Sequence, residues 1–456
     1  MAKKQVSAPA PAPANRPPYM LIEEIRVQGY KSLVDATLHV RPLTLLAGTN
    51  SSGKSSIMQP LLLIKQTMEA PYQPAGALVL DGAHVQAETA GELVSRVFKD
   101  ISNTFSVSLN GQGQSYHKLL PASLKITYKQ IESQFELINQ DMLLRGQLLR
   151  ITPETNWGDV KHQFSISMLA SLENAGVIYA NTHQVRAFLQ LFLMIDDYEI
   201  IAWAPDSIEN MLGQIMHIPG LRNAPERSYP STNLFGVRNH IKGTFDQYVA
   251  GTVSQWQDQE NTEALAKLND YLRRLGLTDS VTAKVKNANK VELSVSRLPA
   301  GTKGRPRKAD MVNIADVGIG VSQVLPILVA LIAAQEGQIV YVEQPELHLH
   351  PKAQVVMAEL LAEAANRGVR VIVETHSSLL LLTVQTLIAQ DRIKNTDVAL
   401  HWFARDAKGA TTVDYVQPDE DGAYGEWPED FGDVELRAQD AYLTAVGERH
   451  FGNAGK

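Results

Sequence analysis

The segment Gly48–Ser55 constrains the fold of this chain more than any other feature. Its sequence, Gly-Thr-Asn-Ser-Ser-Gly-Lys-Ser, matches the pattern G-x-x-x-x-G-K-[ST] without a gap. It follows a short apolar run, Leu43–Ala47, and a helix is expected from Lys54 to about Thr67, with Pro60 distorting its second turn. Glycines let such a loop wrap a phosphate chain, and the amides at the start of the helix face the anion. The sequence therefore predicts a strand, a phosphate-binding loop and a helix.

Two side chains of this loop have roles that follow from their chemistry. Lys54 would place a positive charge at the β- and γ-phosphates of ATP, and the Ser55 hydroxyl would bind Mg²⁺. Such a loop needs an acid at the end of a second strand, and Glu343 follows the apolar run Ile339–Val342. Glu343 would hold Mg²⁺ directly or through water. The candidate ATP ligands are Gly48, Thr49, Asn50, Ser51, Ser52, Gly53, Lys54, Ser55 and Ser56.

The separation of these two motifs narrows the fold class. About 290 residues lie between Lys54 and Glu343, whereas simple P-loop switches place the two parts closer together. A long insertion is the plan of ABC-type ATPase heads, which carry a signature segment just before the second strand. Asp316–Gln323 occupies that place, and its glycine-containing turn opens a helix suited to pointing amides and a hydroxyl at a phosphate. The candidate signature residues are Gly318, Gly320, Ser322 and Gln323.

The last third of the chain alternates between helices and strands. Apolar runs at 338–342 and 369–374 predict two buried strands, and Pro351 suits the first turn of the helix between them. This strand–helix–strand spacing is typical of a parallel sheet. His376 follows the second strand, and its imidazole could contact the γ-phosphate. Other expected elements are an apolar helix at 321–334 and tail strands at 399–403 and 411–415.

The region between the two motifs has a mixed character. Residues 105–168 favour strands, because the stretches 123–128 and 163–168 alternate between apolar and polar residues. Residues 185–216 are expected to be helical in pieces broken by Pro205. The elements expected after them are an amphipathic helix with Leu265, Leu268, Leu272 and Leu275 on one face, which ends at Gly276, and strands at 281–285 and 291–295.

Together these patterns predict an α/β fold: a P-loop NTPase of ABC-ATPase type, with mixed sheets flanked by helices and a long α+β insertion between the Walker A loop and the signature segment. The Ala/Pro-rich start predicts a disordered tail. The expected division is a tail at 1–19, the N-terminal part of the ATPase head at 20–100, the insertion at 101–300, the C-terminal part of the head at 301–405 and a C-terminal tail subdomain at 406–456.

Composition excludes several other kinds of protein and site. Of the 456 residues, 44% are hydrophobic and 20% are charged, which allows a large core and excludes wholesale disorder. The net charge of −7 argues against a wholly basic nucleic-acid coat. The chain has 0 Cys, which excludes disulfides, thiolate metal sites and cysteine nucleophiles. The lack of cysteine predicts a cytoplasmic protein. No apolar run reaches the roughly 18 residues of a membrane span, so we expect no membrane partner.

Four motifs resemble those of ATPase heads of the SMC, RecF and OLD kind: Gly48–Ser55, Gly318–Gln323, Glu343–Pro351 and Glu374–Ser377. Within that group, the segment Glu-Gln-Pro-Glu-Leu-His-Leu-His-Pro and the Trp-Pro and Phe of 426–431 resemble stand-alone bacterial ATPases. The resemblance is strong over 21–65 and 316–431, and between them only the loop 219–230 looks similar. Several relatives serve in bacteriophage defence, Septu-type systems among them, with a nuclease as partner.

This resemblance implies a head-to-tail homodimer, or a higher oligomer, joined through the heads. ATP on the Gly48 loop of one subunit would be capped by the signature residues of the other, and hydrolysis would open the pair. It further implies a sensor or regulator of a partner nuclease in bacterial phage defence. The alternative is a RecF-like DNA-repair clamp without a nuclease partner, and the sequence leaves both open.

One departure from the family concerns the activation of water. Most ABC-type heads have a glutamate directly after the Walker B acid, but here that position is Gln344, which can orient water and is a poor base. Either Glu346 takes over this role, or hydrolysis is slow and the ATP-bound dimer persists. Glu374, beside His376, is a further candidate. The expected catalytic residues are Glu343, Gln344, Glu346 and His376.

Each of two basic segments has two interpretations. The run 303–308 carries four positive charges, and it could bind the phosphate backbone of DNA or RNA or form a solvated hairpin loop. Arg222 and Arg227 lie in the proline-flanked loop 219–230, which could be a site or a rigid turn.

Overall fold

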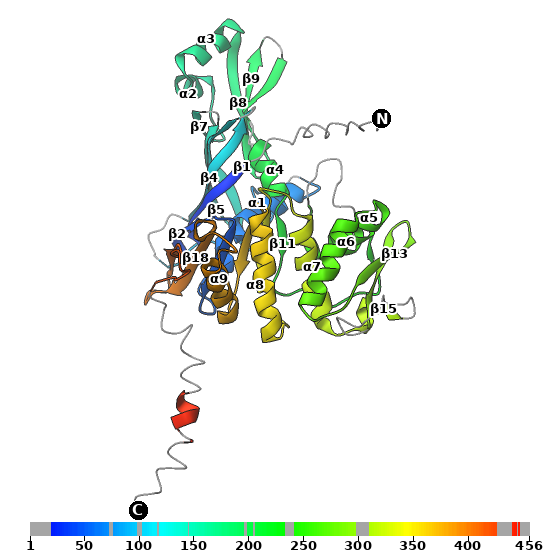
Figure 1. Cartoon of the computed structure of the whole chain (residues 1–456). Helices are drawn as coiled ribbons and strands as arrows, with labels where there is room; N and C mark the ends of the chain where they lie inside the picture. Colours follow the sequence, from blue (N-terminus) through cyan, green and yellow to red (C-terminus); the bar gives the residue numbers. More distant parts are fainter. Residues whose placement is uncertain are drawn as a thin grey trace, which may run out of the picture.

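The structure is a computed structural model, and it describes residues 20–72, 76–97, 103–115, 118–144, 146–195, 198–203, 206–232, 241–297, 310–425, 440–444 and 446. The expected tail 1–19, Pro205, the basic run 303–308 and the segment 426–431 lie outside the described residues. The described part forms an α/β body, from which an arm extends at the top of Figure 1 and a smaller lobe at the right.

The body is built around a six-stranded sheet with the order β11 (Met216–Ile218), β16 (Ile339–Glu343), β17 (Arg370–Glu374), β3 (Leu43–Gly48), β18 (Val398–Arg405) and β19 (Thr411–Val416). The first five strands are parallel to one another, and β19 is antiparallel to β18. Since the carboxyl ends of parallel strands meet at one edge, the loop after β3 and the acids that end β16 and β17 come together.

Both faces of this sheet are covered. All six residues of β3 are buried, as expected for a strand in a parallel sheet with helices on both sides. Leu43 and Leu45 belong to a hydrophobic core shared with α7 (Ile319–Ala333), α8 (Pro351–Asn366) and α9 (Ser378–Ala389). Leu46 belongs to a second core, shared with α1 (Gln59–Glu69) and the N-terminal sheet.

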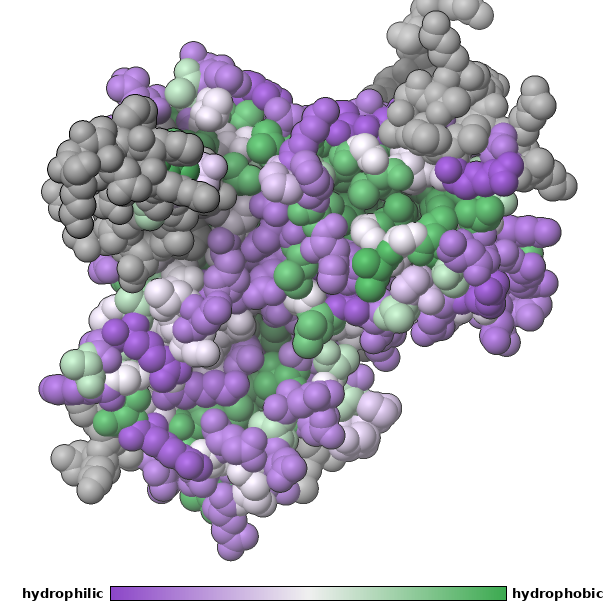
Figure 2. All heavy atoms as spheres, turned by 90° about the horizontal axis from the view of Figure 1, so that it is seen from below, coloured by the Kyte–Doolittle hydropathy of each residue, from purple (hydrophilic) through white to green (hydrophobic). Residues whose placement is uncertain are grey.

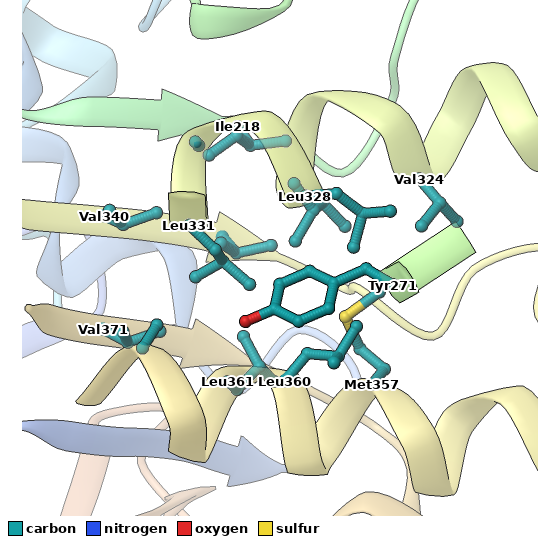
Figure 3. Packing of buried hydrophobic residues seen from close by; sticks show 14 of the residues in the cluster. Ile218, Tyr271, Val324, Leu328, Leu331, Val340, Met357, Leu360, Leu361 and Val371 are labelled. Atoms are coloured by element: carbon teal, nitrogen blue, oxygen red, sulfur yellow. The ribbon is translucent and has the colours of Figure 1, made fainter. Parts of the chain in front are cut away.

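Tyr271 joins the smaller lobe to the body. Its ring lies between side chains of α7 and α8 and close to the central strands (Figure 3). Its hydroxyl donates to Glu363 of α8 at 3.0 Å. The smaller lobe comprises α5 (Val249–Asp258), α6 (Thr262–Arg274), β12 (Tyr229–Pro230), β13 (Val281–Asn287), β14 (Lys290–Ser296) and β15 (Met311–Asn313).

The N-terminal sheet and the arm are antiparallel. The sheet has the order β2 (Leu33–His39), β1 (Met20–Tyr30), β4 (Thr104–Ser115), β5 (Lys118–Ile131), β6 (Gln134–Leu144) and β7 (Gln147–Ile151). Its far end carries α2 (Trp157–Val160), α3 (Ile166–Asn174) and the sheet of β8 (Val177–Val185), β9 (Phe188–Ile195) and β10 (Tyr198–Trp203), and α4 (Asp206–Gly213) leads back to the body (Figure 1). Short 3₁₀ turns lie at Ala90–Glu92, Phe245–Tyr248, Ile314–Asp316 and Asn395–Asp397.

Two predictions for the arm were wrong. The stretch 163–168 is not a strand, because a 3₁₀ turn ends at Gln163 and α3 begins at Ile166. Ser165 caps that helix by accepting a hydrogen bond from the amide of Met168, and this cap decides the local structure over six alternating residues. Most of 185–203 is strand rather than helix, since β9 and β10 pair as an antiparallel ladder.

The helix after the phosphate loop also differs from the prediction. A 3₁₀ turn occupies Ser55–Ile57, and α1 begins only at Gln59. Pro60 therefore lies in the first turn of α1, where a missing amide costs nothing and no distortion follows. The predicted strands and helices of the last third, the Pro351 helix start and the helix ending before Gly276 are confirmed.

Seen from below, most of the surface is hydrophilic, with hydrophobic side chains in patches between the lobes and on the right-hand one (Figure 2). Among the described residues, none of the helices combines the length and the apolar character needed to cross a membrane.

Candidate functional site

The phosphate loop is shaped by glycines that no other residue could replace without strain. Gly48 has φ 143° and Gly53 has φ 100°, both in the region that favours glycine. A Cβ on Gly48 would lie 2.1 Å from the carbonyl oxygen of Phe403 on the neighbouring strand β18. The close contact with β18 therefore restricts the backbone conformation at the start of the loop.

Lys54 is held inside this loop. Its ammonium donates to the carbonyl oxygens of Gly48 at 3.1 Å and Thr49 at 2.8 Å, and only 3% of the residue is exposed. Burial lowers the pKa of Lys54, while Glu374 and Glu346 nearby act in the opposite direction. A buried cation inside a loop of backbone amides is the arrangement that binds phosphates.

Glu374 lies closer to the loop than the sequence suggested. The Ser55 hydroxyl donates to Glu374 Oε1 at 3.0 Å, and the Tyr341 hydroxyl donates to Oε2 at 3.3 Å. β17 runs between β3 and β16, so its last residue pairs with Glu343 across the ladder and faces Ser55 on the other side. The sequence offered one signal for this acid, its position at the end of a buried apolar run.

Glu343 at the end of β16 has partners on both carboxylate oxygens. Oε1 lies 3.0 Å from Nε2 of His217, and Oε2 accepts from the amide of Gly220 at 3.0 Å. Burial opposes ionisation, but the hydrogen bonds from His217 and Gly220 outweigh it, so the pKa of Glu343 lies below its ordinary value. The carboxylate is thus ionised and oriented, as a Mg²⁺ ligand must be.

The turn after β16 brings Glu346 to His376. Gln344 has φ 46°, and its amide donates to the carbonyl oxygen of Glu374 at 2.7 Å. Glu346 Oε1 accepts from the amide of His376 at 2.6 Å, whereas its buried Oε2 has no hydrogen-bond partner among the described residues. Burial raises the pKa of Glu346 and lowers that of half-buried His376. Glu346 therefore holds the segment after β17 and keeps one oxygen free.

Arg222 joins the Walker B turn to the signature helix. Its guanidinium donates to the carbonyl oxygens of Glu343 at 2.7 Å and Gln344 at 3.3 Å, and also to that of Gln323 in α7 at 3.2 Å. Burial lowers its pKa to about 10, which leaves it charged at neutral pH. The amide side chain of Gln323 donates back to the carbonyl oxygen of Asn223. Arg222 thus acts within one subunit as a structural link.

The four signature residues differ in their exposure to solvent. Gly318 is exposed with open space around its Cα, Gly320 and Ser322 are half-buried, and Gln323 is buried. The Ser322 hydroxyl donates to the carbonyl oxygen of Ile319 at 2.8 Å. A cavity of about 230 Å³ adjoins Ser322 beneath the loop that carries Arg222. Near the start of the segment, Arg227 forms an exposed ion pair with Asp316 at 2.7 Å.

The oxygen donors at this edge fit Mg²⁺. Ser55, Glu343 and Glu374 offer one hydroxyl and two carboxylates from neighbouring strand ends. Mg²⁺ in nucleotide sites takes few protein ligands and completes its shell with water and phosphate oxygens. The described residues contain no group of three or more His, Asp or Glu side chains that could hold a metal ion by themselves.

Comparison with protein families gives two matches, one in the N-terminal part of the chain and one in the C-terminal part. Residues 20–142 match the family described as "AAA ATPase domain", and residues 255–382 match the family described as "AAA domain, putative AbiEii toxin, Type IV TA system". No curated protein matches the chain. Both families are ATPase domains, so the ATPase head that the motifs indicated is confirmed.

Solved structures with a similar course of the chain include SMC heads. An SMC head bound to the C-terminal winged-helix domain of ScpA is 12% identical, with 88% of this chain and 98% of that chain covered and a TM-score of 0.43. For an SMC head with an extended coiled coil, bound to the C-terminal domain of ScpA and from Pyrococcus furiosus, the values are 10%, 94%, 99% and 0.45. For the SMC head domain of Thermotoga maritima they are 12%, 87%, 99% and 0.36.

Proposed function

We propose that this chain, an AAA-family ATPase built as an ABC-type head of the SMC and RecF kind, works as an ATP-gated dimeric switch. Two copies would bind two ATP molecules between them, each held by the Gly48–Ser56 loop of one subunit and by Gly318, Gly320, Ser322 and Gln323 of the other. The observation that carries this proposal is a difference in partners: the start of the signature segment, at Gly318 and Ile319, is exposed, whereas the phosphate loop has its own partners within the subunit.

Within one site, each residue has a distinct task. Lys54 would leave its loop carbonyls and bind the β- and γ-phosphates, and Ser55 would exchange Glu374 for the metal. Mg²⁺, when bound, neutralises charge on the phosphates. Ser55 and Glu343 would hold it. His376 would reach the γ-phosphate as a neutral imidazole, because its lowered pKa keeps it uncharged.

Hydrolysis is expected to be slow. Gln344 can orient a water molecule but cannot take its proton. The free oxygen of Glu346 and its raised pKa suit a general base, because a pKa nearer to neutrality lets a carboxylate accept a proton more readily. The other carboxylate oxygen of Glu346 accepts a hydrogen bond from the amide of His376. We therefore infer turnover well below the roughly 10 s⁻¹ of a median enzyme, with a persistent ATP-bound dimer.

The mass of the protein in solution tests this switch. Sedimentation of the wild-type chain should show monomers without nucleotide and dimers with Mg²⁺ and ATP, which return to monomers as ADP accumulates. Lys54→Ala is the control and should stay monomeric with ATP. A wild-type chain that stays monomeric at saturating ATP, or that dimerises equally without nucleotide, would contradict the proposal.

A partner nuclease in phage defence is the further part of the proposal, and it rests on the motif resemblance. In the cytoplasm of a bacterium the switch would hold the nuclease inactive or release it according to nucleotide state. Co-expression with a nuclease encoded beside this gene should protect cells from bacteriophage, and Lys54→Ala should abolish the protection. Protection unaffected by that variant would contradict the role, and neighbouring replication genes would favour the RecF-like clamp.

A further inference from the structure

A buried line of polar side chains leads from Glu343 into the body. His217 Nε2 lies 3.0 Å from Glu343 Oε1, and His217 Nδ1 lies 2.9 Å from Nδ1 of His84. His84 Nε2 is 3.5 Å from Glu69 Oε2, and Glu69 Oε1 is 2.7 Å from the ammonium of Lys65. The side chains of His84 and Lys65 are 0% exposed and that of His217 is 2% exposed. Burying titratable groups costs folding free energy, so a buried row of them indicates a function.

The line connects the two Walker motifs behind the nucleotide site. Lys65 and Glu69 belong to α1, the helix that begins after the phosphate loop. His217 lies on β11, the strand next to β16, and its ring stacks on Tyr341 with centroids 5.2 Å apart. The Gln66 side chain of α1 accepts from the amide of His84 at 3.2 Å and so fixes the loop that carries it. The far end of the Walker A helix is therefore tied to the Walker B acid.

The ionisation of Glu343 dictates where the protons of this line lie. An ionised carboxylate only accepts, so His217 Nε2 must carry a proton and donate. In a neutral imidazole Nδ1 is then an acceptor, so His84 must donate from its own Nδ1. Burial lowers the pKa of His84 to about 4, which keeps that ring neutral, and its Nε2 is left as a bare acceptor. His84 Nε2 has no hydrogen-bond partner among the described residues, although Glu69 Oε2 lies 3.5 Å from it.

We propose that His217 and His84 are positioning residues of the Mg²⁺ site, which keep the Glu343 carboxylate in its metal-binding orientation and couple it to α1. The inference rests on the proposed function, since it concerns the same site. Partners of this kind, one step away from the metal, orient the ligand and raise its affinity for the metal, and their loss typically costs about 10–100-fold. Glu343 has a second such partner in the Gly220 amide, so removal of His217 should weaken the site and not abolish it.

Substitutions at the two histidines separate this role from a packing role. His217→Asn keeps a polar group near Nδ1 and removes the donor to Glu343, whereas His217→Gln keeps a donor near Nε2. His84→Leu retains volume but lets His217 move its proton to Nδ1, away from Glu343. We expect the Mg²⁺ concentration for half-maximal ATP binding to rise about 10–100-fold in His217→Asn and His84→Leu, and to recover at least in part in His217→Gln.

The controls distinguish a metal effect from a general loss of folding. Binding of ATP in EDTA should be unchanged in all three variants, because the loop itself is intact. His401→Gln removes another buried imidazole, on β18 and outside this line, and should leave the Mg²⁺ dependence at the wild-type value. A change of less than 2-fold in the Mg²⁺ requirement of both His217→Asn and His84→Leu, with urea unfolding showing folded proteins, would overturn the proposal.

The histidine protons can be observed without turnover. Long-range ¹H–¹⁵N correlation of the wild-type side chains should show His217 protonated on Nε2 and His84 on Nδ1, and His84→Leu should shift His217 toward a mixture. The opposite assignment in the wild-type protein would overturn the arrangement. A wild-type chain with these tautomers that binds no nucleotide would instead overturn the proposed function, and with it the role in binding Mg²⁺.

Discussion

The two halves of the proposed nucleotide site differ in how they are held within one subunit. At the strand ends, Lys54 bonds its own loop, Ser55 bonds Glu374, and Glu343 bonds His217 and Gly220. At the signature segment, Gly318 faces open space and the neighbouring Ile319 is 48% exposed. A set of groups that is already ordered can bind nucleotide alone, whereas an open segment contributes only when another molecule meets it. The difference supports the proposal that the site is completed between subunits.

The largest effect expected is on the ordered half. Lys54→Ala removes the ammonium that donates to the carbonyl oxygens of Gly48 and Thr49, and turnover should fall by roughly 10³-fold, the upper end for one preorganised donor. Affinity for ATP, measured by equilibrium binding, should fall with it. Lys352→Ala, at an exposed position on α8, is the control and should behave as wild type. ATP affinity unchanged in Lys54→Ala would contradict the assignment of this loop.

A change in the open half should spare binding and block assembly. Ser322→Arg places a long cation where the partner's phosphates are expected, at a half-buried position that adjoins a cavity of about 230 Å³. We expect ATP affinity of the monomer within about 2-fold of wild type, no ATP-induced dimer, and turnover lower by about 10²-fold through the loss of the donors in trans. Normal assembly and normal turnover in this variant would mean that each subunit hydrolyses ATP alone.

Two substitutions in the ordered half identify the residue that activates the attacking water. Glu346→Gln should lower turnover by about 10²-fold if the free carboxylate oxygen is the base, and Gln344→Glu should raise it if the glutamine limits the rate. Because burial raises the pKa of Glu346, wild-type turnover should decline on acidification at a pH above the ordinary carboxyl range, and Glu346→Gln should lack that decline. Turnover unaffected by either substitution would point to Glu374 instead.

The sequence predicted the phosphate loop and Glu343 better than it predicted the residues that hold Glu343 in place. The loop, Glu343 and the helix start at Pro351 are contiguous patterns whose local chemistry decides the structure. The partners of Glu343 are His217 on β11 and Gly220 just after it, and β11 is a strand of 3 residues more than 100 positions away, too short to show a period. In the arm, the nearly unbroken apolar run of β9 is as compatible with a helix as with a strand, and the pairing with β8 and β10 decides. Long-range pairing of this kind leaves no local signal.

Arg222 is the link that makes the two halves dependent on each other. Arg222→Lys replaces a planar group with three carbonyl partners by a single ammonium, which cannot reach all three. Turnover should fall by about 10-fold, as the loss of charged hydrogen bonds implies, while ATP affinity changes little. Arg227→Lys, at an exposed ion pair with Asp316, is the matched control and should stay within about 2-fold. Equal effects of the two variants would mean that the halves act independently.

The smallest effect concerns the sheet behind the ordered half. His401 of β18 is fully buried, its Nε2 accepts from the amide of His39 at 2.9 Å, and burial lowers its pKa to about 3. The unfolded chain takes up this proton near pH 6.5 and the folded chain does not, so stability is lost as the pH falls through 6.5 toward 3. At pH 5.5 the loss amounts to about 1.4 kcal/mol.

His401→Gln keeps an acceptor for the amide of His39 and removes the titration, so its free energy of unfolding in urea should fall less between pH 7.5 and 5.5 than that of the wild-type protein. Equal declines in the two proteins would show that this imidazole is protonated or exposed when folded, and that the strands behind the phosphate loop are less rigid than their burial implies.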